Sequence, residues 1–561
     1  MHKLWEIFEE NVDPLTKIVH VPTLRPAVQK ALVDTSTIPR SFEALLFAIY
    51  GAAIMSLKDA ECQRRFSAPR RSLLSRYTSA TGKALSRAKF METTSLVVLQ
   101  ALVLHLLSVR DVYAPRAVWS LTGVAVRIAQ TMGLERDGTF LGLSPFETEL
   151  RRRIWWQLKL HDFRTAELCG LAKFRDLDMG VESPRWPTNL DDDQLHPGMT
   201  SLVDESDKVT DILFVAFRCE MTNFAASRVA EFRKQGKDPS MWALHTQDQS
   251  AKARAFIELQ DTLETKYLRY CDPSRPLHLL TMLVGRYGMN VVKFLTNHPR
   301  KWISLDQTPP EERKLVWDVS IKLLEQHDMV QSTPMLQPFA WHATYFQQWH
   351  AFIHVLDILR ADPLNSDAAK AWKLVGNTYE NTPAMILDMK KPLHIAVAKL
   401  CLKAYGAREV AMQTATLNPG PTPAFIIRLR QRWETIKAKQ RAQNAKSFDV
   451  VHSSQSQGTV LDESNSVFIA ITSRNAPTVN VPDRGIAPQM ENLGPSVSHM
   501  QNNPFDFFTG LNDPQYGAGD TGFEFPSTED SNVDGFDMTT VDWEQWDAWL
   551  ADSNVMRPYP A

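Results

Sequence analysis

Apolar residues recur at helical spacing through the first 440 or so residues. Leu4, Ile7 and Phe8, at positions i, i+3 and i+4, form a first apolar face that ends near Asp13. Further helices are predicted near residues 44–57, 85–109, 116–132, 208–234, 246–268, 276–295, 310–330, 340–360, 366–375 and 391–413. Alternation of apolar and polar residues, which is typical of strands, is scarce. The pattern therefore predicts an all-α fold, a large multi-helix array without a parallel sheet.

Two helix ends carry clear boundary signals. Gly133 follows the segment 116–132 and suits a C-cap, because glycine readily adopts the left-handed conformation. Within that segment, the small residue Gly123 predicts a close approach of helices. Ser144 and Pro145 predict the N-cap and first residue of a further helix, through residue 160, and Glu147 at its third position brings the start close to a capping box.

Charged residues are interleaved within two turns of that helix. They are Glu147, Glu149, Arg151, Arg152 and Arg153. We expect ion pairs within this set and with Asp137, Arg127 or Arg136. Two interpretations remain open: a structural ion-pair lattice, which we favour, and a shared binding surface or hinge.

The most apolar stretch, residues 96–109, is too short to cross a membrane. Gln100 and His105 interrupt it, and a membrane-spanning helix needs about 20 apolar residues. We expect a buried core helix here and no membrane contact.

Charge is distributed unevenly along a nearly neutral chain. The 561 residues include 62 basic and 64 acidic side chains, for a net charge of −2. Such a balance argues against a chain that binds nucleic acid along its whole length. The last 61 residues, however, hold twelve acids and one base, so the other 500 residues carry a charge of +9.

A basic helix is predicted over residues 416–446. Its candidate phosphate-contacting or nuclear-targeting residues are Arg428, Arg430, Arg432, Lys437, Lys439 and Arg441. The favoured alternative is a solvated terminal helix whose apolar residues pack on the core. Those residues are Phe425, Ile426, Leu429 and Trp433.

Residues 447–500 and 501–561 differ in composition from the rest. The first segment is rich in Ser, Asn, Gln and Pro and predicts a disordered linker. The second alternates acidic and aromatic residues, which is typical of an amphipathic activation tail. If residues 541–550 form a helix, four anchors become available to a coactivator groove: Trp543, Trp546, Trp549 and Leu550.

The sequence offers no catalytic or metal site. Five cysteines (Cys62, Cys169, Cys219, Cys271 and Cys401) are odd in number and far apart, which favours a reducing compartment. His350 and His354 share i, i+4 spacing near His342, but the aromatic residues around them favour core positions. Residues 191–193 are three aspartates that predict a solvated turn, with a metal site as the less favoured alternative. Nucleophile, P-loop and triad motifs are missing, so we expect no enzyme and no cofactor in this chain.

Several blocks together resemble the fungal-specific transcription factor domain, the middle homology region of zinc-cluster regulators. Residues 4–24 resemble its opening, residues 98–137 resemble its most recognisable block, and residues 144–164 resemble the block after it. Later similarities lie at residues 267–283 and 347–359. The likeness covers roughly residues 1–410. It implies a helical regulatory domain over residues 1–415.

The resemblance also implies a function. Family members regulate transcription by RNA polymerase II in the fungal nucleus, often of metabolic or biosynthetic genes. They usually carry an N-terminal zinc cluster with six cysteines, which is absent from this chain. We therefore expect weak or indirect contact with DNA, through a zinc-cluster transcription factor or a homodimer, and coactivators as partners of the tail.

Two other interpretations remain open. The chain could be a fragment of a zinc-cluster factor whose DNA-binding exon is missing. It could also be a helical enzyme or metabolite-binding protein.

Overall fold

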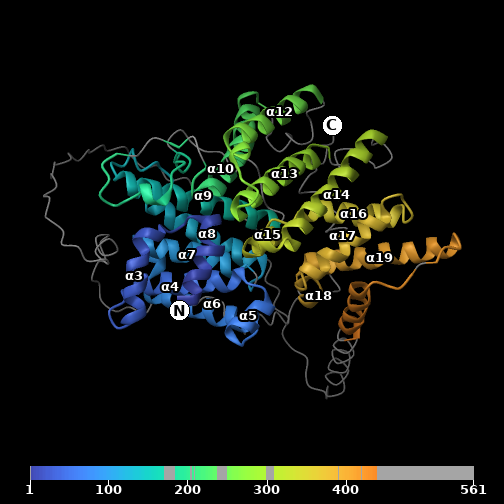
Figure 1. Ribbon diagram of the computed structural model, residues 1–561, viewed down its shortest axis with the longest axis horizontal. Helices are drawn as coiled ribbons and strands as arrows, with labels where there is room; N and C mark the ends of the chain where they lie inside the picture. Colours follow the sequence, from blue (N-terminus) through green and yellow to red (C-terminus); the bar gives the residue numbers. More distant parts are fainter. Residues whose placement is uncertain are drawn as a thin grey trace, which may run out of the picture. The chain divides into compact units, whose positions relative to one another are not determined.

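The computed structural model describes residues 2–438, except residues 111, 170–182, 202–204, 207–208, 237–248, 298–308, 390 and 419. All regular structure in these described residues is helical, which confirms the predicted all-α fold (Figure 1). The described residues through Ile427 belong to one compact unit, here called the body, and those from Arg428 belong to a second unit. The linker and tail lie outside the described residues.

The first half of the body surrounds one buried helix. Its elements are α1 (His2–Asn11), α2 (Asp13–Thr16), α3 (Val21–Val33), α4 (Arg40–Ser56), α5 (Asp59–Phe66), α6 (Arg70–Arg87), η1 (Phe90–Glu92), α7 (Leu96–Val109), α8 (Pro115–Thr131) and α9 (Pro145–Leu168). All residues of α7 are buried, because α4, α6, α8 and α9 pack around it. This confirms the predicted core helix. In the described part of the chain, no helix is long and apolar enough to span a membrane.

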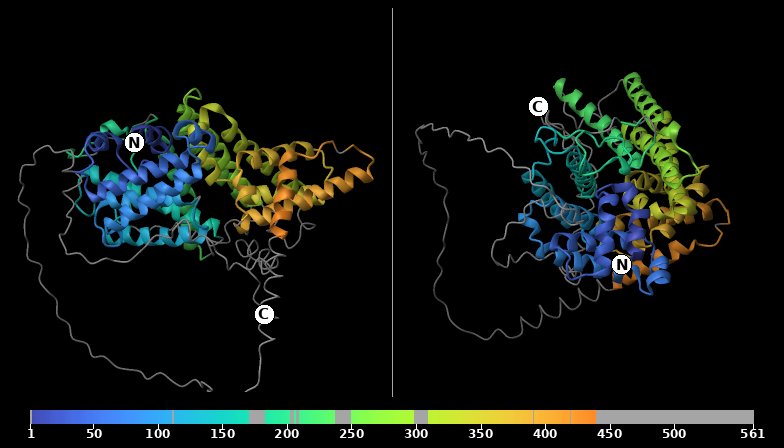
Figure 2. Two further views of the ribbon diagram at one scale, coloured as in Figure 1. Left: turned by 90° about the horizontal axis from the view of Figure 1, so that it is seen from below. Right: turned by 60° about the vertical axis from the view of Figure 1, so that its left-hand side comes forward.

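The second half of the body is a stack of longer helices (Figure 2). Its elements are η3 (Asp192–Gln194), α10 (Leu213–Lys234), α12 (Gln249–Lys266), η5 (Leu268–Tyr270), α13 (Pro276–Asn297), α14 (Pro310–Ser332), η8 (Pro334–Phe339), α15 (Ala340–Tyr345), α16 (Trp349–Ala361), α17 (Ala368–Asn381), α18 (Ala384–Leu387) and α19 (Pro392–Thr414). α14 packs against α13, α16 and α17, and α16 packs against α19. A last helix begins at residue 424, later than the predicted 416, and is described through residue 438.

Two predicted helices are each broken in two. The segment 85–109 contains the end of α6, then η1, then α7, with Lys89 in the left-handed conformation at the break. The segment 340–360 contains α15 and α16, separated at residues 346–348. The helices α3, α5 and α6 were not predicted.

Both predicted helix ends are confirmed. Gly133, at φ 76°, follows α8, and the Leu134 N–H donates to the Ala129 carbonyl in a Schellman arrangement. At the start of α9, the Ser144 hydroxyl accepts a hydrogen bond from the Glu147 N–H at 3.2 Å. Gly123, by contrast, lies where an added Cβ would meet no atom within 4 Å. The expectation that it permits close helix packing was wrong.

Candidate functional site: a buried charge network beneath residues 183–201

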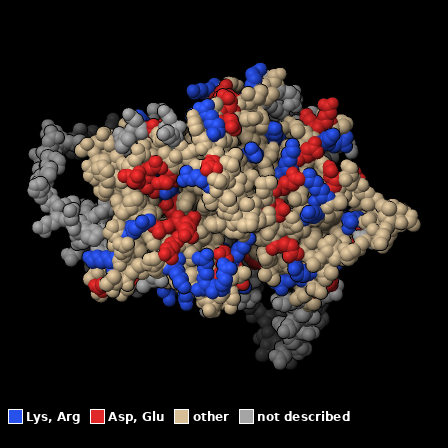
Figure 3. All heavy atoms as spheres, viewed as in Figure 1, with Lys and Arg blue, Asp and Glu red and all other residues tan. Residues whose placement is uncertain are grey.

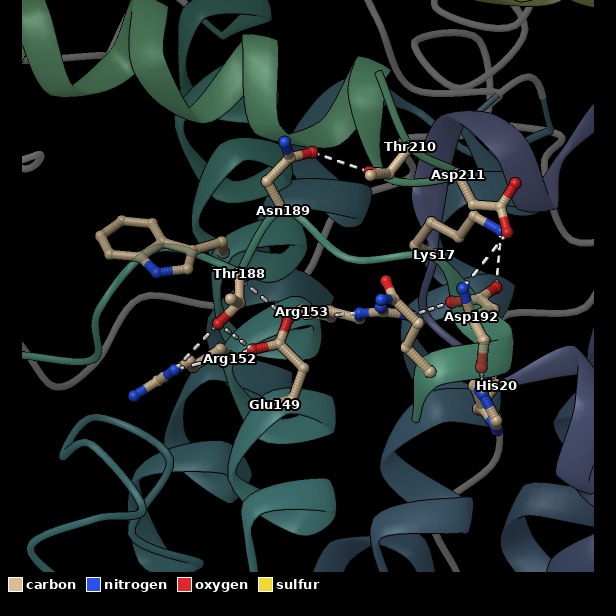
Figure 4. Close-up of polar contacts among 12 residues, drawn as sticks. Lys17, His20, Glu149, Arg152, Arg153, Thr188, Asn189, Asp192, Thr210 and Asp211 are labelled. Atoms are coloured by element: carbon tan, nitrogen blue, oxygen red, sulfur yellow. Dashed lines mark hydrogen bonds and ion pairs between the residues drawn. The ribbon is translucent and has the colours of Figure 1, made fainter. Parts of the chain in front are cut away.

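Three charged residues in the first half of α9 lie in the protein interior. Glu149 and Arg153 are fully buried, and Arg152 is 3% exposed. Because an isolated buried charge is costly, each of them needs a partner. The partners come from the loop after α8, from α2 and the residues that follow it, and from the segment 183–201, here called the strap. Figure 4 shows Glu149, Arg152 and Arg153 of α9 with Lys17, Thr188 and Asp192.

Arg152 and Asp137 form the first part of the network. The Arg152 Nε and Nη2 atoms donate to the two Asp137 carboxylate oxygens at 2.8 and 2.9 Å, a bidentate pair. The strap joins it, since the Arg185 N–H donates to Asp137 Oδ2 at 2.8 Å. Burial opposes ionisation of Asp137, but these hydrogen bonds hold the pKa of its carboxyl well below the usual range. The predicted pairing with Asp137 is confirmed. Arg127 instead donates to Gln130.

Glu149 anchors the middle of the strap to α9. The Thr188 N–H donates to Glu149 Oε1 at 3.0 Å, and the Thr188 hydroxyl donates to Oε2 at 2.9 Å. Arg153 lies one turn along the same helix, and its Nε donates to Glu149 at 3.4 Å. A carboxylate with two hydrogen bonds from one strap residue fixes the position of that residue closely.

Asp192 is the junction of the network. Its carboxylate accepts from Arg153 Nη1 at 2.7 Å and from Lys17 Nζ at 2.7 Å. Its carbonyl lies 2.7 Å from His20 Nε2. Burial raises the pKa of Asp192, but the two cations outweigh burial and lower it. Residues 17, 153 and 192, far apart in sequence, thus meet at one carboxylate.

The expectation of a solvated turn at residues 191–193 was therefore wrong. Asp192 is only 5% exposed and begins η3, while Asp191 caps that helix in a capping box with Gln194. Asp193 alone of the three is exposed. The acidic run was the one sequence signal for this part of the network. The cationic partners of Asp192 are too distant in the chain to be recognised from the sequence.

Asp13 is the poorly compensated member of the network. It accepts from Lys17 Nζ at 3.0 Å through Oδ2, while its buried Oδ1 has no hydrogen-bond partner among the described residues. Burial, together with the nearby charge of Asp192, outweighs the attraction of Lys17 and raises the pKa of Asp13 to about 6. The network thus contains one carboxyl group whose charge is costly.

A second buried cluster joins α9 and α13 to the end of α15. Arg164 of α9 donates to the Tyr345 carbonyl at 2.6 and 2.9 Å and to the Gln347 carbonyl at 3.1 Å. The Tyr287 hydroxyl donates to the Phe346 carbonyl at 3.0 Å. These side chains satisfy backbone carbonyls that a continuous helix would use internally, which explains the break at residues 346–348.

Of the three histidines predicted to lie in the core, two are core residues, and the third, His350, is half-buried. His342 is 4% exposed and His354 is 9% exposed. Burial, and then the charges of three nearby arginines, lower the pKa of His342 well below 6.5. These imidazole rings pack against aromatic side chains in the core. The ring centroids of His342 and Phe346, for example, lie 4.4 Å apart.

The cysteines of this chain do not fit a zinc cluster. Cys62, Cys219 and Cys401 are buried in different parts of the body, and burial raises the pKa of each thiol, to about 11 for Cys62 and about 12 for the other two. Zinc is bound by thiolates that lie close together. Among the described residues, no group of three or more candidate metal ligands is found.

The other predicted site residues are placed only in part. Arg428 and Arg430 are exposed on the helix 424–438, Arg432 and Lys437 are half-buried, and Lys437 pairs with Glu434 at 3.1 Å. Phe425 and Ile426 are buried in the body, where Phe425 stacks on Tyr379. Lys439, Arg441 and the anchors Trp543, Trp546, Trp549 and Leu550 lie outside the described residues.

Comparison with known proteins gives one family match. Residues 5–178 match the family described as the fungal specific transcription factor domain. This range begins in α1 and contains α2–α9, the helices that supply most of the network.

Three relatives illustrate the similarity. The chain is 32% identical to the aurofusarin cluster transcription factor aurR2 of Gibberella zeae, over 80% of this chain and 66% of the relative. It is 32% identical to the pyriculol/pyriculariol biosynthesis cluster transcription factor 1 of Pyricularia oryzae, over 76% of this chain and 57% of that relative. It is 28% identical to the C6 finger domain transcription factor hasF of Aspergillus fumigatus, over 64% and 51%. The chain thus spans between about half and two thirds of the length of these relatives.

Proposed function

Because this chain belongs to the family that carries the fungal specific transcription factor domain, we propose that it regulates RNA polymerase II transcription of a metabolic or biosynthetic gene set in a fungal nucleus. The observation that supports this most is that the matched residues, 5–178, coincide with the helices around the charge network. The relatives are named as transcription factors of fungal biosynthetic clusters. The role of the chain is regulatory rather than catalytic.

The proposal assigns a task to each part of the chain. Residues 1–415 form the regulatory domain, residues 416–446 contain the basic helix, and residues 447–500 are the linker. Residues 501–561 recruit coactivators through their acidic and aromatic side chains. The strong negative charge of this tail, with twelve acids, supports the last assignment because it keeps the aromatic residues solvated and available.

Promoter selection needs a partner in this proposal. The cysteines present do not fit a zinc cluster, so sequence-specific contact with DNA comes from a zinc-cluster protein or from residues outside this chain. The basic residues of the segment 428–441 serve nuclear targeting. The proposed partner is a zinc-cluster transcription factor or a second copy of this chain.

Deletion of the gene in its fungal host, followed by genome-wide transcript measurement, tests the function. We expect transcripts of a defined metabolic gene set to fall together and to return when the gene is restored. A transcript profile that is unchanged under conditions in which the protein is made would contradict the proposal.

A further inference from the structure

The positive charge of the body is concentrated on two adjacent helices. Residues 59–89, which contain α5 and α6, hold eight basic and two acidic side chains, a charge of +6, which equals the whole net charge of residues 1–427. Figure 3 shows the basic side chains gathered on the surface at the place of α5 and α6. We propose that this surface, here called the α5–α6 face, binds the phosphate backbone of duplex DNA without sequence preference.

The geometry of α6 presents its cations on one side. Leu73, Leu74 and Leu85 are buried, because α6 packs against α4 and α7. The exposed residues of the opposite side are Arg71, Ser72, Arg76, Ser79, Lys83 and Arg87. Along the axis of α6, at 1.5 Å per residue, Lys83 lies about 10 Å beyond Arg76, and Arg87 lies about 6 Å beyond Lys83. The helix is held on the core from behind, so the spacing of its cations is fixed.

Much of this charge is not neutralised by the body itself. Arg71, Arg76 and Lys83 form no ion pair within the described residues. Arg87 pairs with Glu43 at 2.7 Å, and Glu61 lies 3.7 Å from Arg64 and 3.6 Å from Arg65. These pairs are exposed to solvent, where an ion pair contributes little and is readily exchanged for another anion.

The chemistry of the face favours nucleic acid over the acidic tail of this chain. Arginine, lysine and serine side chains are the groups that contact phosphate oxygens in protein–DNA complexes. An acidic and aromatic segment would need an apolar groove for its tryptophans. Among the described residues, no large hydrophobic side chain of the segment 59–89 is strongly exposed. The α5–α6 face therefore offers charge and hydroxyl groups without such a groove.

This inference rests on the proposed function and adds to it, because it gives the body itself a contact with DNA. Sequence-independent contact would raise the local concentration of the regulator on DNA while a partner selects the promoter. It also predicts a specific dependence on salt, since each neutralised phosphate releases counterions and contributes about −0.9 to the slope of log K against log salt concentration.

Binding of the purified full chain to a 20-base-pair duplex of random sequence tests the inference. Fluorescence anisotropy between about 50 and 200 mM NaCl gives the salt slope. With roughly four phosphate contacts we expect a slope of about −3.6, which is on the order of a hundredfold loss of affinity across this range. The double variant Arg76→Gln/Lys83→Gln should reduce the magnitude of the slope by about 1.8.

A matched control removes the same charge elsewhere. Arg313 and Lys373 are exposed on α14 and α17, and Arg313→Gln/Lys373→Gln should leave the slope unchanged. The inference would be overturned if the magnitude of the salt slope fell equally in both double variants, or fell in neither. Circular dichroism melting of each variant verifies that it is folded.

A second measurement identifies any competing occupant. Carbodiimide joins contacting lysine and carboxylate side chains, so it reports whether Lys83 touches the tail of the full chain. Cross-links from Lys83 to residues 501–561 at low salt would show that the tail occupies the face and would overturn the DNA assignment. Since the transcript experiment does not measure DNA affinity, the failure of either proposal can be recognised separately.

Discussion

At the scale of single residues, the buried carboxylate of Asp192 is the most consequential group. It is shared by Lys17 and Arg153, and all three side chains are less than a tenth exposed. Removal of one partner from a buried ion pair leaves a charge without compensation, which typically costs about 3–5 kcal/mol. We therefore expect Asp192→Asn to lower the free energy of unfolding by about 3 kcal/mol in urea denaturation.

The neighbouring residue supplies the control for this substitution. Asp193→Asn makes the same chemical change one position along the strap, at an exposed side chain. It should change the free energy of unfolding by less than about 0.5 kcal/mol. Equal effects of the two substitutions would mean that the network does not stabilise the body.

The dependence of stability on pH is set in part by Asp13. Its pKa in the folded protein is raised, to about 6, above the usual value of 3.8, so between these values the folded state binds more protons than the unfolded state. The contribution of Asp13 to the free energy of unfolding therefore falls as pH rises from about 4 to about 6. Asp192, whose pKa is lowered, contributes stability at higher pH that is lost below about 4.

Chemical denaturation at a series of pH values checks this sign. As pH rises from about 4 to about 6, the free energy of unfolding of the parent should fall relative to that of Asp13→Asn. A difference that is constant with pH would show that Asp13 does not titrate there.

At the scale of elements, the close approach of the loop after α8 to α9 depends on Gly138. A Cβ added there would lie 2.5 Å from Thr148 Oγ1 and 3.0 Å from Thr148 Cα, so the backbone itself would have to move. Gly138→Ala should shift Asp137 away from Arg152 and destabilise the body by about 1–3 kcal/mol.

Gly123→Ala is the matched control for Gly138→Ala. It lies within α8 where an added Cβ meets open space, so it should stabilise the body by about 0.5–1 kcal/mol through helix propensity. Thermal unfolding of the two variants should therefore move in opposite directions. A Gly138→Ala variant as stable as the parent would mean that α9 can move away from the loop after α8 without loss of stability.

The elements that could be predicted from the sequence were those with a strong local signal. α7 is mostly apolar, and α9 has a capped start, so both were recognised. α3 contains Pro26 and α6 is rich in serine and arginine, so neither has a local apolar pattern strong enough to stand out. These helices depend on tertiary packing, of α6 against α4 and α7 and of α3 against η3.

The candidate site was predictable only in its local pairs, Asp137 with Arg152 and Glu149 with Arg153. Asp137 and Arg152 are close in sequence, and their pairing was expected. Asp192 meets Lys17 and Arg153 across 175 and 39 residues, and no local pattern encodes such a meeting. Arg164 likewise bonds carbonyls more than 180 residues away, and those bonds divide α15 from α16.

At the scale of the whole molecule, charge is divided between a basic portion and an acidic tail. Residues 501–561 carry −11 and the rest carries +9. In the proposed function the tail activates transcription through a few large anchors, and loss of one anchor typically costs about 2 kcal/mol or more of binding.

Fusion of residues 501–555 to an unrelated DNA-binding domain isolates the tail. The variant Trp543→Ala/Trp546→Ala should abolish most reporter activity, whereas Asp542→Asn/Asp547→Asn should reduce it less, because the acids mainly keep the aromatic residues solvated. A double tryptophan variant as active as its parent would remove the helix-in-groove interpretation.

The most direct test of the central claim is to tether the full chain of 561 residues to a reporter promoter through an unrelated DNA-binding domain. This measurement does not depend on how the chain finds its own promoters. We predict strong activation by the full chain and loss of most of it when residues 501–561 are removed, at equal protein levels. Reporter activity no higher than that of the DNA-binding domain alone would contradict the account of this chain as a transcription activator.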